Sequence, residues 1–300
     1  MKTTLDQYDI AFIGHVCFDE VLPYQGEPRI APGSAVTCGA LAAARVGKDV
    51  VVVTRMAPQD QIVLEDLQQN GVTVHVIPTA ETTYMKVVHP SADVDEREIY
   101  QLKNAGFFSP EEMPSITARQ VHLAGITDQE FDLNFIRALK EKGYRLSADM
   151  QSFVRQVDPA TRCIFFKDVP AKTEIVRLLD MVKLDIVEAK VLTGTDDLEQ
   201  AALIFESWGC PEILITKADG VLARVNGKTY YEKFSNQSVV GRTGRGDTTF
   251  AAYLARRMDH DVTESLKFAA ALVSLKMETP GPFCGTLDEV LLRMRDKHSG

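Results

Sequence analysis

The sequence lacks the features that would place it with nucleic-acid-binding, membrane or disulfide-rich secreted proteins. It has no run of five or more basic residues and a net charge of −9, which argues against a nucleic-acid partner. Its five cysteines are scattered without a C-x-x-C pair, a pattern typical of reduced thiols. No apolar run approaches the ~20 residues that span a bilayer, and the polar segment from Met1 to Asp9 does not resemble a signal peptide. We therefore expect a cytoplasmic protein without a membrane or nucleic-acid partner.

Several common catalytic motifs are missing as well. The six histidines are too far apart for an H-x-x-H metal site, and no G-x-S-x-G element supports acyl hydrolysis. No G-x-x-x-x-G-K-[ST] phosphate loop occurs. Its nearest match, at 226–229, is better interpreted as a hairpin turn, because Asn-Gly there lies between two strand-like runs. These absences argue against a histidine-ligated metal site, an acyl hydrolase and a P-loop enzyme.

The sequence instead alternates short apolar runs with helical stretches. The strand-like runs are 10–14, 50–54, 120–124, 145–149, 181–187 and 212–216. The helical stretches are 36–46, 60–70, 129–142, 172–181 and 198–207. This alternation predicts an α/β fold with a mainly parallel central sheet flanked by helices. With 45% hydrophobic residues, the 300-residue chain suits a single domain over 1–300 that has a sizeable core.

The most informative segment is V-G-R-T-G-R-G-D-T-T-F at 240–250. A strand-like run, 237–240, leads into a glycine turn, after which Asp247 opens a helical pattern. Glycine lacks a Cβ, so backbone N–H groups can approach a ligand closely, and a helix start adds unpaired N–H donors that bind phosphate. A carboxylate beside such a site can take the proton from an attacking hydroxyl, which indicates phosphoryl transfer. The alternative is that Asp247 only caps the helix.

This turn resembles the C-terminal signature of the ribokinase-like (PfkB-type) carbohydrate kinases, whose usual form is D-T-T-G-A-G-D. Gly244, Gly246 and Asp247 match the signature, whereas Gly241 and Arg245 replace the usual Asp and Ala. The resemblance implies that Asp247 is the general base. It also implies that the N–H groups of Gly244, Arg245 and Gly246 hold the transferring phosphoryl group.

Two further segments carry the same resemblance. Residues 33–47 are similar to the N-terminal signature of the family, and 185–188 are similar to its N-x-x-E motif. The matches occur in family order over nearly the whole chain. Residues 16–32 and 82–108 interrupt the strand–helix alternation, are polar, and have β character. By resemblance, these two stretches form a small β lid over the sugar, and their edges pair in a homodimer.

The resemblance implies ATP and Mg²⁺ as cofactors, held by a second set of residues. Thr216 and Gly220 belong to a loop similar to the family's T-x-G-x-x-G but shortened by one residue, although the same residues also suit an ordinary turn. Glu188 is implied to orient metal-bound water, with Asp185 in place of the family's Asn. Many relatives bind K⁺ through the Asp that this turn lacks. We expect the charge of Arg242 to replace that ion, and therefore little dependence on monovalent cations.

The acceptor site is implied by residues at the carboxyl ends of strands, where ligands of open α/β sheets bind. Asp19, Gly33 and Asp149 fall at such positions. Asp19 stands where relatives bind sugar hydroxyls, and a carboxylate can accept hydrogen bonds from two vicinal hydroxyls. Surface or capping roles are the alternative for both acids. Because Arg29 and Arg97 are the nearest obvious cations, this acidic site predicts a neutral acceptor rather than a sugar phosphate.

The function predicted from the sequence is thus an ATP-dependent kinase that phosphorylates a hydroxyl of a small neutral sugar or polyol. A nucleoside kinase of the same fold is one alternative. A non-catalytic sugar- or nucleotide-binding sensor is the other, because the loop 216–220 departs from the family pattern. The small apolar face of 269–271 would admit an adenine base, but core packing explains that face equally well.

Overall fold

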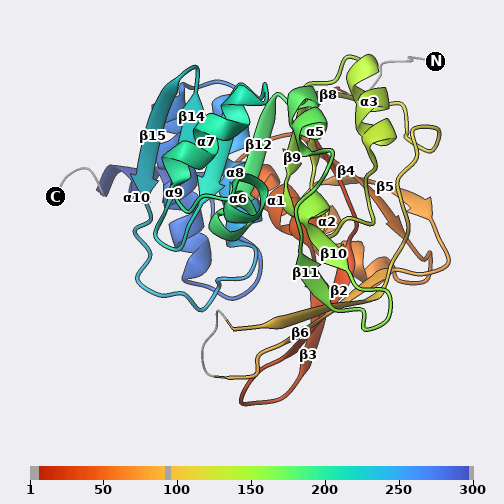
Figure 1. Cartoon of the computed structure of the whole chain (residues 1–300). Helices are drawn as coiled ribbons and strands as arrows, with labels where there is room; N and C mark the ends of the chain where they lie inside the picture. Colours follow the sequence, from red (N-terminus) through yellow and green to blue (C-terminus); the bar gives the residue numbers. More distant parts are fainter. Residues whose placement is uncertain (1–6, 92–95, 297–300) are drawn as a thin grey trace, which may run out of the picture.

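The computed structural model describes residues 7–91 and 96–296 as a large sheet between helices, with a smaller sheet beneath it (Figure 1). The large sheet has the strand order β15-β14-β13-β12-β9-β8-β1-β4-β5. Neighbours from β13 to β5 pair in parallel, whereas β13–β14 and β14–β15 are antiparallel. The strands are β1 Gln7–Ile13, β4 Val50–Met56, β5 Thr73–Pro78, β8 Thr117–Leu123, β9 Leu146–Asp149, β12 Met181–Asp185, β13 Glu212–Thr216, β14 Gly220–Val225 and β15 Lys228–Lys233. The mainly parallel sheet predicted from the sequence is confirmed.

Both faces of this sheet are covered by helices, which explains why its central strands are continuous apolar runs. Ile10 and Phe12 of β1 belong to one apolar cluster, while Ala11 and Ile13 belong to the other. The first face packs against η1 Gln61–Leu64, α1 Ala35–Arg45, α2 Glu65–Gln69, α8 Arg245–Arg257, α9 Val262–Met277 and α10 Leu287–Asp296. The second packs against α3 Leu133–Glu141, α5 Lys172–Leu178, α6 Ile186–Thr193 and α7 Leu198–Ser207 (Figure 1).

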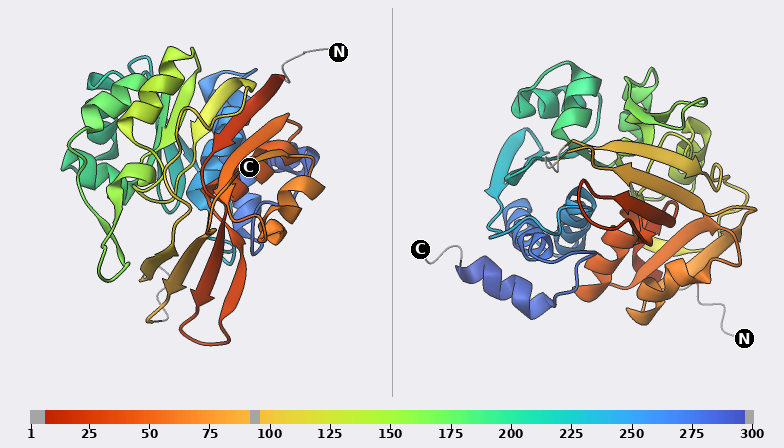
Figure 2. Two further views of the ribbon diagram at one scale, coloured as in Figure 1. Left: turned by 90° about the vertical axis from the view of Figure 1, so that its right-hand side faces the viewer. Right: turned by 90° about the horizontal axis from the view of Figure 1, so that it is seen from below.

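The smaller sheet is built from the two stretches that interrupt the strand–helix alternation. Its order is β3-β2-β6-β7, with β2 Cys17–Leu22, β3 Arg29–Gly33, β6 Thr83–Val88 and β7 Glu98–Lys103. Seen from below, it lies across the underside of the large sheet (Figure 2). A short helix, α4 Gln151–Val154, and the hairpin of β10 Arg155–Val157 and β11 Ile164–Phe166 follow β9. The small sheet therefore faces the end of the large sheet at which its parallel strands terminate.

The structure differs from the sequence-based expectations in places. Residues 237–240 are not a strand: they pair with none of the strands within 7–91 and 96–296, and Val239 and Val240 are 55% and 66% exposed. Helix α8 begins at Arg245, with Gly244 at its N-cap in a left-handed conformation (φ 76°). Asp247 therefore lies inside the first turn, and the capping alternative for it is wrong. Within 7–91 and 96–296, every helix is too short or too polar to cross a membrane.

Candidate active site

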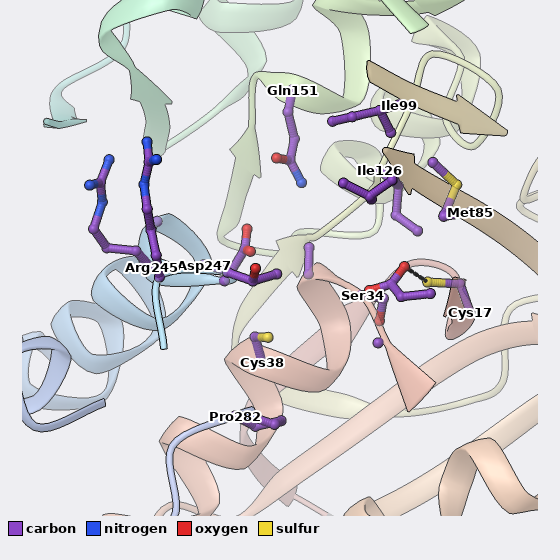
Figure 3. Close-up of a pocket in the computed structure, with 18 of the residues that line it drawn as sticks. Cys17, Ser34, Cys38, Met85, Ile99, Ile126, Gln151, Arg245, Asp247 and Pro282 are labelled. Carbon is purple, nitrogen blue, oxygen red and sulfur yellow. Dashed lines mark hydrogen bonds between the residues drawn. The ribbon is translucent and has the colours of Figure 1, made fainter. Parts of the chain in front are cut away.

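A cavity of about 350 Å³ lies between the small sheet and the strand ends of the large sheet (Figure 3). Strands β2, β3, β6 and β7 line one side of it, and the ends of β12 and β13 line another. The N-termini of α1 and α8 complete the wall through Ser34 and the turn 242–247. Helix N-termini carry unpaired N–H groups and the positive end of the helix dipole. Two of them at one cavity favour an anionic ligand.

Gly244 at the N-cap of α8 and Gly246 in its first turn lie where an added Cβ would crowd a neighbouring side chain. A Cβ on Gly244 would be 2.5 Å from the Cys38 Sγ, and one on Gly246 would be 2.8 Å from the Lys183 Nζ. The backbone of the turn is thus packed directly against α1 and β12. Of the three N–H groups expected to hold a phosphoryl group, that of Arg245 donates to the Arg242 carbonyl oxygen (3.1 Å).

Asp247 lines the cavity from the first turn of α8. Its Oδ1 is buried and has no hydrogen-bond partner among the described residues. Buried polar atoms are nearly always hydrogen-bonded, so this oxygen is available to a ligand. Figure 3 shows Asp247 between Arg245 and an apolar group of side chains that includes Ile126. The carboxylate and the glycine turn 242–246 therefore face the same cavity.

Lys183 of β12 was not singled out from the sequence, yet it lies at the centre of the site. Its side chain is 4% exposed, its Nζ lies 2.7 Å from the Asp149 Oδ2, and it lines the cavity beside Gly246. Lys183 and Asp149 are register partners on β12 and β9. The signal in the sequence was a lysine inside the apolar run 181–184, because a lysine is almost never fully buried unless it is paired.

The Lys183–Asp149 contact is an ion pair. Burial raises the pKa of Asp149 to about 6, while Lys183 opposes the shift, so Asp149 is ionised at neutral pH. Burial alone would lower the pKa of Lys183, but Asp149, Glu188 and Asp247 outweigh it and leave that pKa above its usual value. Asp149 itself is 1% exposed and is not among the residues that line the cavity. The structure thus places it behind Lys183, whereas the sequence suggested direct substrate contact.

Asp185 and Glu188 form a capping box at the start of α6. The Asp185 Oδ1 accepts hydrogen bonds from the N–H groups of Val187 and Glu188, both 2.9 Å, and the Glu188 Oε2 accepts one from the Asp185 N–H. Only Asp185 of the two lines the cavity. Glu188 is fully buried, 3.5 Å from Arg155, and burial followed by the nearby Asp185 raises its pKa. Glu188 therefore supports Asp185 from behind.

Two of the three residues expected to bind the acceptor, Asp19 and Gly33, are brought together in the small sheet. Asp19 and Gly33 line the cavity, and a Cβ on Gly33 would lie 2.0 Å from the Asp19 Oδ2. Asp19 accepts a hydrogen bond from the Cys17 Sγ (3.3 Å), and burial, followed by the effect of Asp247, raises its pKa to about 6. The apolar side chains of Met85, Ile99 and Ile126 line the same part of the cavity (Figure 3). This part suits a ligand with both hydroxyl groups and an apolar face.

The residues expected to bind the donor are only partly brought together. Thr216 and Arg242 line the cavity, but Gly220 does not. A Cβ on Gly220 would lie 2.5 Å from the Tyr231 hydroxyl, so it packs against β15. Residues 269–271 are at most 4% exposed, and core packing therefore accounts for this face.

The sequence predicted an acidic site whose nearest cations are Arg29 and Arg97, and this prediction is wrong, because cationic side chains outnumber carboxylates in the cavity lining. Three carboxylates line the cavity, namely Asp19, Asp185 and Asp247. Six cationic side chains do so as well, namely Arg29, Arg97, Arg155, Lys183, Arg242 and Arg245.

Among the described residues, no group of three or more His, Cys, Asp or Glu side chains is arranged to hold a metal ion.

Comparisons with known proteins agree with this geometry. Residues 3–284 match the sequence model of the family described as "pfkB family carbohydrate kinase". A cytidine kinase from Thermococcus kodakarensis is 27% identical over 258 residues, which cover 82% of this chain and 87% of the relative. A pyrophosphate-dependent kinase of the ribokinase family, solved as a sulfate complex, is 34% identical with a TM-score of 0.87, over 94% of this chain and 99% of that one. The ribokinase of Arabidopsis thaliana, 18% identical, shares the fold with a TM-score of 0.77 over 97% and 99% of the chains. The chain belongs to the pfkB family of carbohydrate kinases.

Proposed function

We propose that this protein transfers a phosphoryl group to a hydroxyl of a small neutral sugar or polyol. The observation that carries the proposal is the unpartnered Oδ1 of Asp247, which lies beside the anion-binding turn and in the same cavity as Asp19. A non-catalytic sensor would have no need of a carboxylate at the mouth of a phosphate site, since a carboxylate repels phosphate.

In this mechanism Asp247 accepts the proton of the attacking hydroxyl through its Oδ1. The hydroxyl oxygen then bonds to the terminal phosphorus of the donor as the bond to the leaving phosphate breaks. Negative charge on the transferred group is stabilised by the N–H groups at Gly244 and Gly246 and by the ammonium of Lys183, which lies against Gly246. Because the Lys183 side chain is only 4% exposed, its charge is weakly screened by water.

The residues present fit Mg²⁺ bound together with the donor. Mg²⁺ usually keeps several waters and binds through one or two carboxylates and the substrate phosphates. Asp185 lines the cavity and is held by the capping box, so it would hold the ion, directly or through water, with Glu188 fixing its position. The ion would offset the charge of the donor phosphates.

Two phosphoryl donors are candidates for this cavity, ATP and inorganic pyrophosphate. ATP is the donor expected from the sequence. Inorganic pyrophosphate is favoured by three observations: the six cationic side chains around the cavity, the absence of Gly220 from its lining, and the burial of 269–271. A relative that is 32% identical, with a TM-score of 0.85, was solved with a pyrophosphate analogue and myo-inositol. Pyrophosphate has no nucleobase, so its binding requires only positive charges that contact phosphate, and this cavity supplies them.

The acceptor part of the cavity suits a ring that carries several hydroxyls. Asp19 and Gln151 offer polar atoms, while Met85, Ile99 and Ile126 offer an apolar surface. Inositols and monosaccharides present both kinds of surface. A nucleoside acceptor is the second candidate, supported by the similarity to a cytidine kinase.

The test is a matrix of donors and acceptors. Purified protein with Mg²⁺ would be incubated with ATP or pyrophosphate and with myo-inositol, monosaccharides or nucleosides, and the products identified by ³¹P NMR. We expect a phosphomonoester of a neutral acceptor with at least one donor. Formation of product only from a sugar phosphate, or none from any pair, would contradict the proposal.

The small sheet also supports the proposal of a homodimer. Strand β3 is an edge strand, and Ile30 on it is 59% exposed. An edge strand with an exposed apolar side chain can pair with a second copy. Sedimentation of the protein beside an Ile30→Lys variant would test this, since the charge should shift the protein toward a monomer.

A further inference from the structure

A buried lysine lies directly behind the anion-binding turn. Lys276, in the last turn of α9, is fully buried. Its ammonium donates hydrogen bonds to the backbone carbonyl oxygens of Gly241 and Thr243. Both acceptors belong to the turn that leads into Gly244. Lysine is rarely buried without a partner, and here the partners are carbonyl oxygens of the phosphate-binding segment.

The same turn is attached to the end of α9 by its backbone. The Gly241 N–H donates to the Met277 carbonyl oxygen (2.8 Å). A Cβ on Gly241 would lie 1.8 Å from the Thr279 carbonyl oxygen and 2.6 Å from that of Lys276. No side chain fits at position 241 unless the backbone moves. Position 241 therefore supplies no carboxylate to the turn. The cation that binds the turn is the Lys276 ammonium, which comes from α9.

Electrostatics explain why a cation is needed at this point. The carbonyl oxygens of Gly241 and Thr243 both accept hydrogen bonds from the one ammonium group of Lys276, and the C-terminus of α9 adds the negative end of a helix dipole. Gly241 is buried, and a buried carbonyl group without a partner is costly. Burial lowers the pKa of Lys276, whereas the nearby Cys38 and Asp247 raise it. A positive charge there compensates these negative groups.

We propose that Lys276 is a positioning residue that acts as a built-in monovalent cation and holds the anion-binding turn in its phosphate-accepting shape. The enzyme would consequently need no K⁺ or ammonium from solution. This inference rests on the proposed function, because the turn is taken to bind the transferring phosphoryl group. From the sequence we expected the same cation independence but assigned the charge to Arg242. In the structure it is Lys276 that donates hydrogen bonds to the carbonyl oxygens of the turn, whereas Arg242 lines the cavity.

Chemical rescue tests the proposal. Lys276→Ala removes the ammonium and leaves a space that a small cation can enter, whereas Lys276→Met fills that space without charge. Lys267→Ala, on the same helix but outside the cavity lining, is the matched control. Each protein would be assayed for kcat and KM in K⁺, ammonium, methylammonium and tetramethylammonium chloride at equal ionic strength.

We expect wild type and Lys267→Ala to vary by less than about twofold among the four salts. In tetramethylammonium, both Lys276 variants should lose about tenfold or more in kcat, in keeping with the loss of one charge that orders an anion site. Ammonium, methylammonium or K⁺ should restore a large part of this loss in Lys276→Ala but not in Lys276→Met. A merely structural lysine would give no such difference between the two variants.

Three results would overturn the proposal. They are activation of wild type by K⁺ of about tenfold over tetramethylammonium, full activity of Lys276→Met, and a folded Lys276→Ala that is inactive in every salt. The first result is obtained with wild type alone, so the proposal can be refuted even if the variants do not fold. If wild type phosphorylates no acceptor, the proposed function fails. Binding of pyrophosphate, measured as a rise in melting temperature, then serves as the readout. Among wild type, Lys267→Ala and Lys276→Ala, only Lys276→Ala should require a small cation for pyrophosphate to raise its melting temperature.

Discussion

Replacing Lys183 separates its structural role from the catalytic role that we propose for it. Lys183→Met removes the ammonium from a pair in which both side chains are at most 4% exposed and the Nζ–Oδ2 distance is 2.7 Å. Breaking such a buried pair leaves the Asp149 carboxylate without its partner, which costs about 3–5 kcal/mol. The same change removes a cation beside Gly246. Loss of one group that stabilises the transferring charge lowers kcat by about 10²–10³-fold.

A second substitution distinguishes these two effects. Asp149→Asn in the Lys183→Met background removes the unpaired charge but keeps an oxygen for the Gln151 N–H, which donates to the Asp149 Oδ1 at 3.1 Å. We expect the double variant to regain about 2 kcal/mol or more of the unfolding free energy, because an uncharged pair is far less costly to bury. Its kcat should stay low, since no cation has been restored.

Urea denaturation and steady-state kinetics on the same preparations provide the two readouts. The reasoning is refuted if the double variant recovers kcat together with stability, because Lys183 would then act only through folding. It is also refuted if Lys183→Met keeps wild-type kcat. Asp149→Asn alone, which leaves Lys183 charged, should retain more activity than Lys183→Met.

Further predictions concern three other residues of the cavity. Gly246→Ala places a Cβ 2.8 Å from the Lys183 Nζ, so kcat should collapse while the melting temperature changes little. Because the pKa of Asp19 is raised to about 6, this carboxylate becomes protonated as the pH falls below 6. The KM for the acceptor should then rise, and Asp19→Asn should have a high KM that no longer changes across this range. Arg245→Ala should raise the donor KM and weaken its dependence on ionic strength, whereas the acceptor KM should stay constant.

Local patterns were sufficient to predict the main sheet and to place the glycine turn and Asp247 in one site. Parallel strands that are buried on both faces must be apolar throughout, and the run 10–13 shows this directly in the sequence. The glycines 244 and 246 and Asp247 lie within one turn, so their proximity is set by the local backbone. The resemblance to a family supplied Asp19 and Gly33, which lie far from that turn in sequence.

Residues that act through long-range contacts were not predictable in this way. The positions of Lys183 and Lys276 depend on the pairing of β12 with β9 and on the packing of α9 behind the turn. Asp149 was expected to meet substrate because it ends a strand, but its register partner Lys183 lies between it and the cavity. The run 237–240 has strand-like side chains, yet it pairs with no strand in the part of the chain that the structure describes.

The most direct test of the central claim is the turnover of Asp247→Asn with the donor and acceptor that the wild type uses. The substitution keeps the shape of the side chain and removes the base. We predict that kcat falls by about 10²–10⁴-fold, while the melting-temperature increase caused by the donor remains. Wild-type turnover by a folded Asp247→Asn protein would contradict the account, because the proton of the acceptor hydroxyl would then go elsewhere.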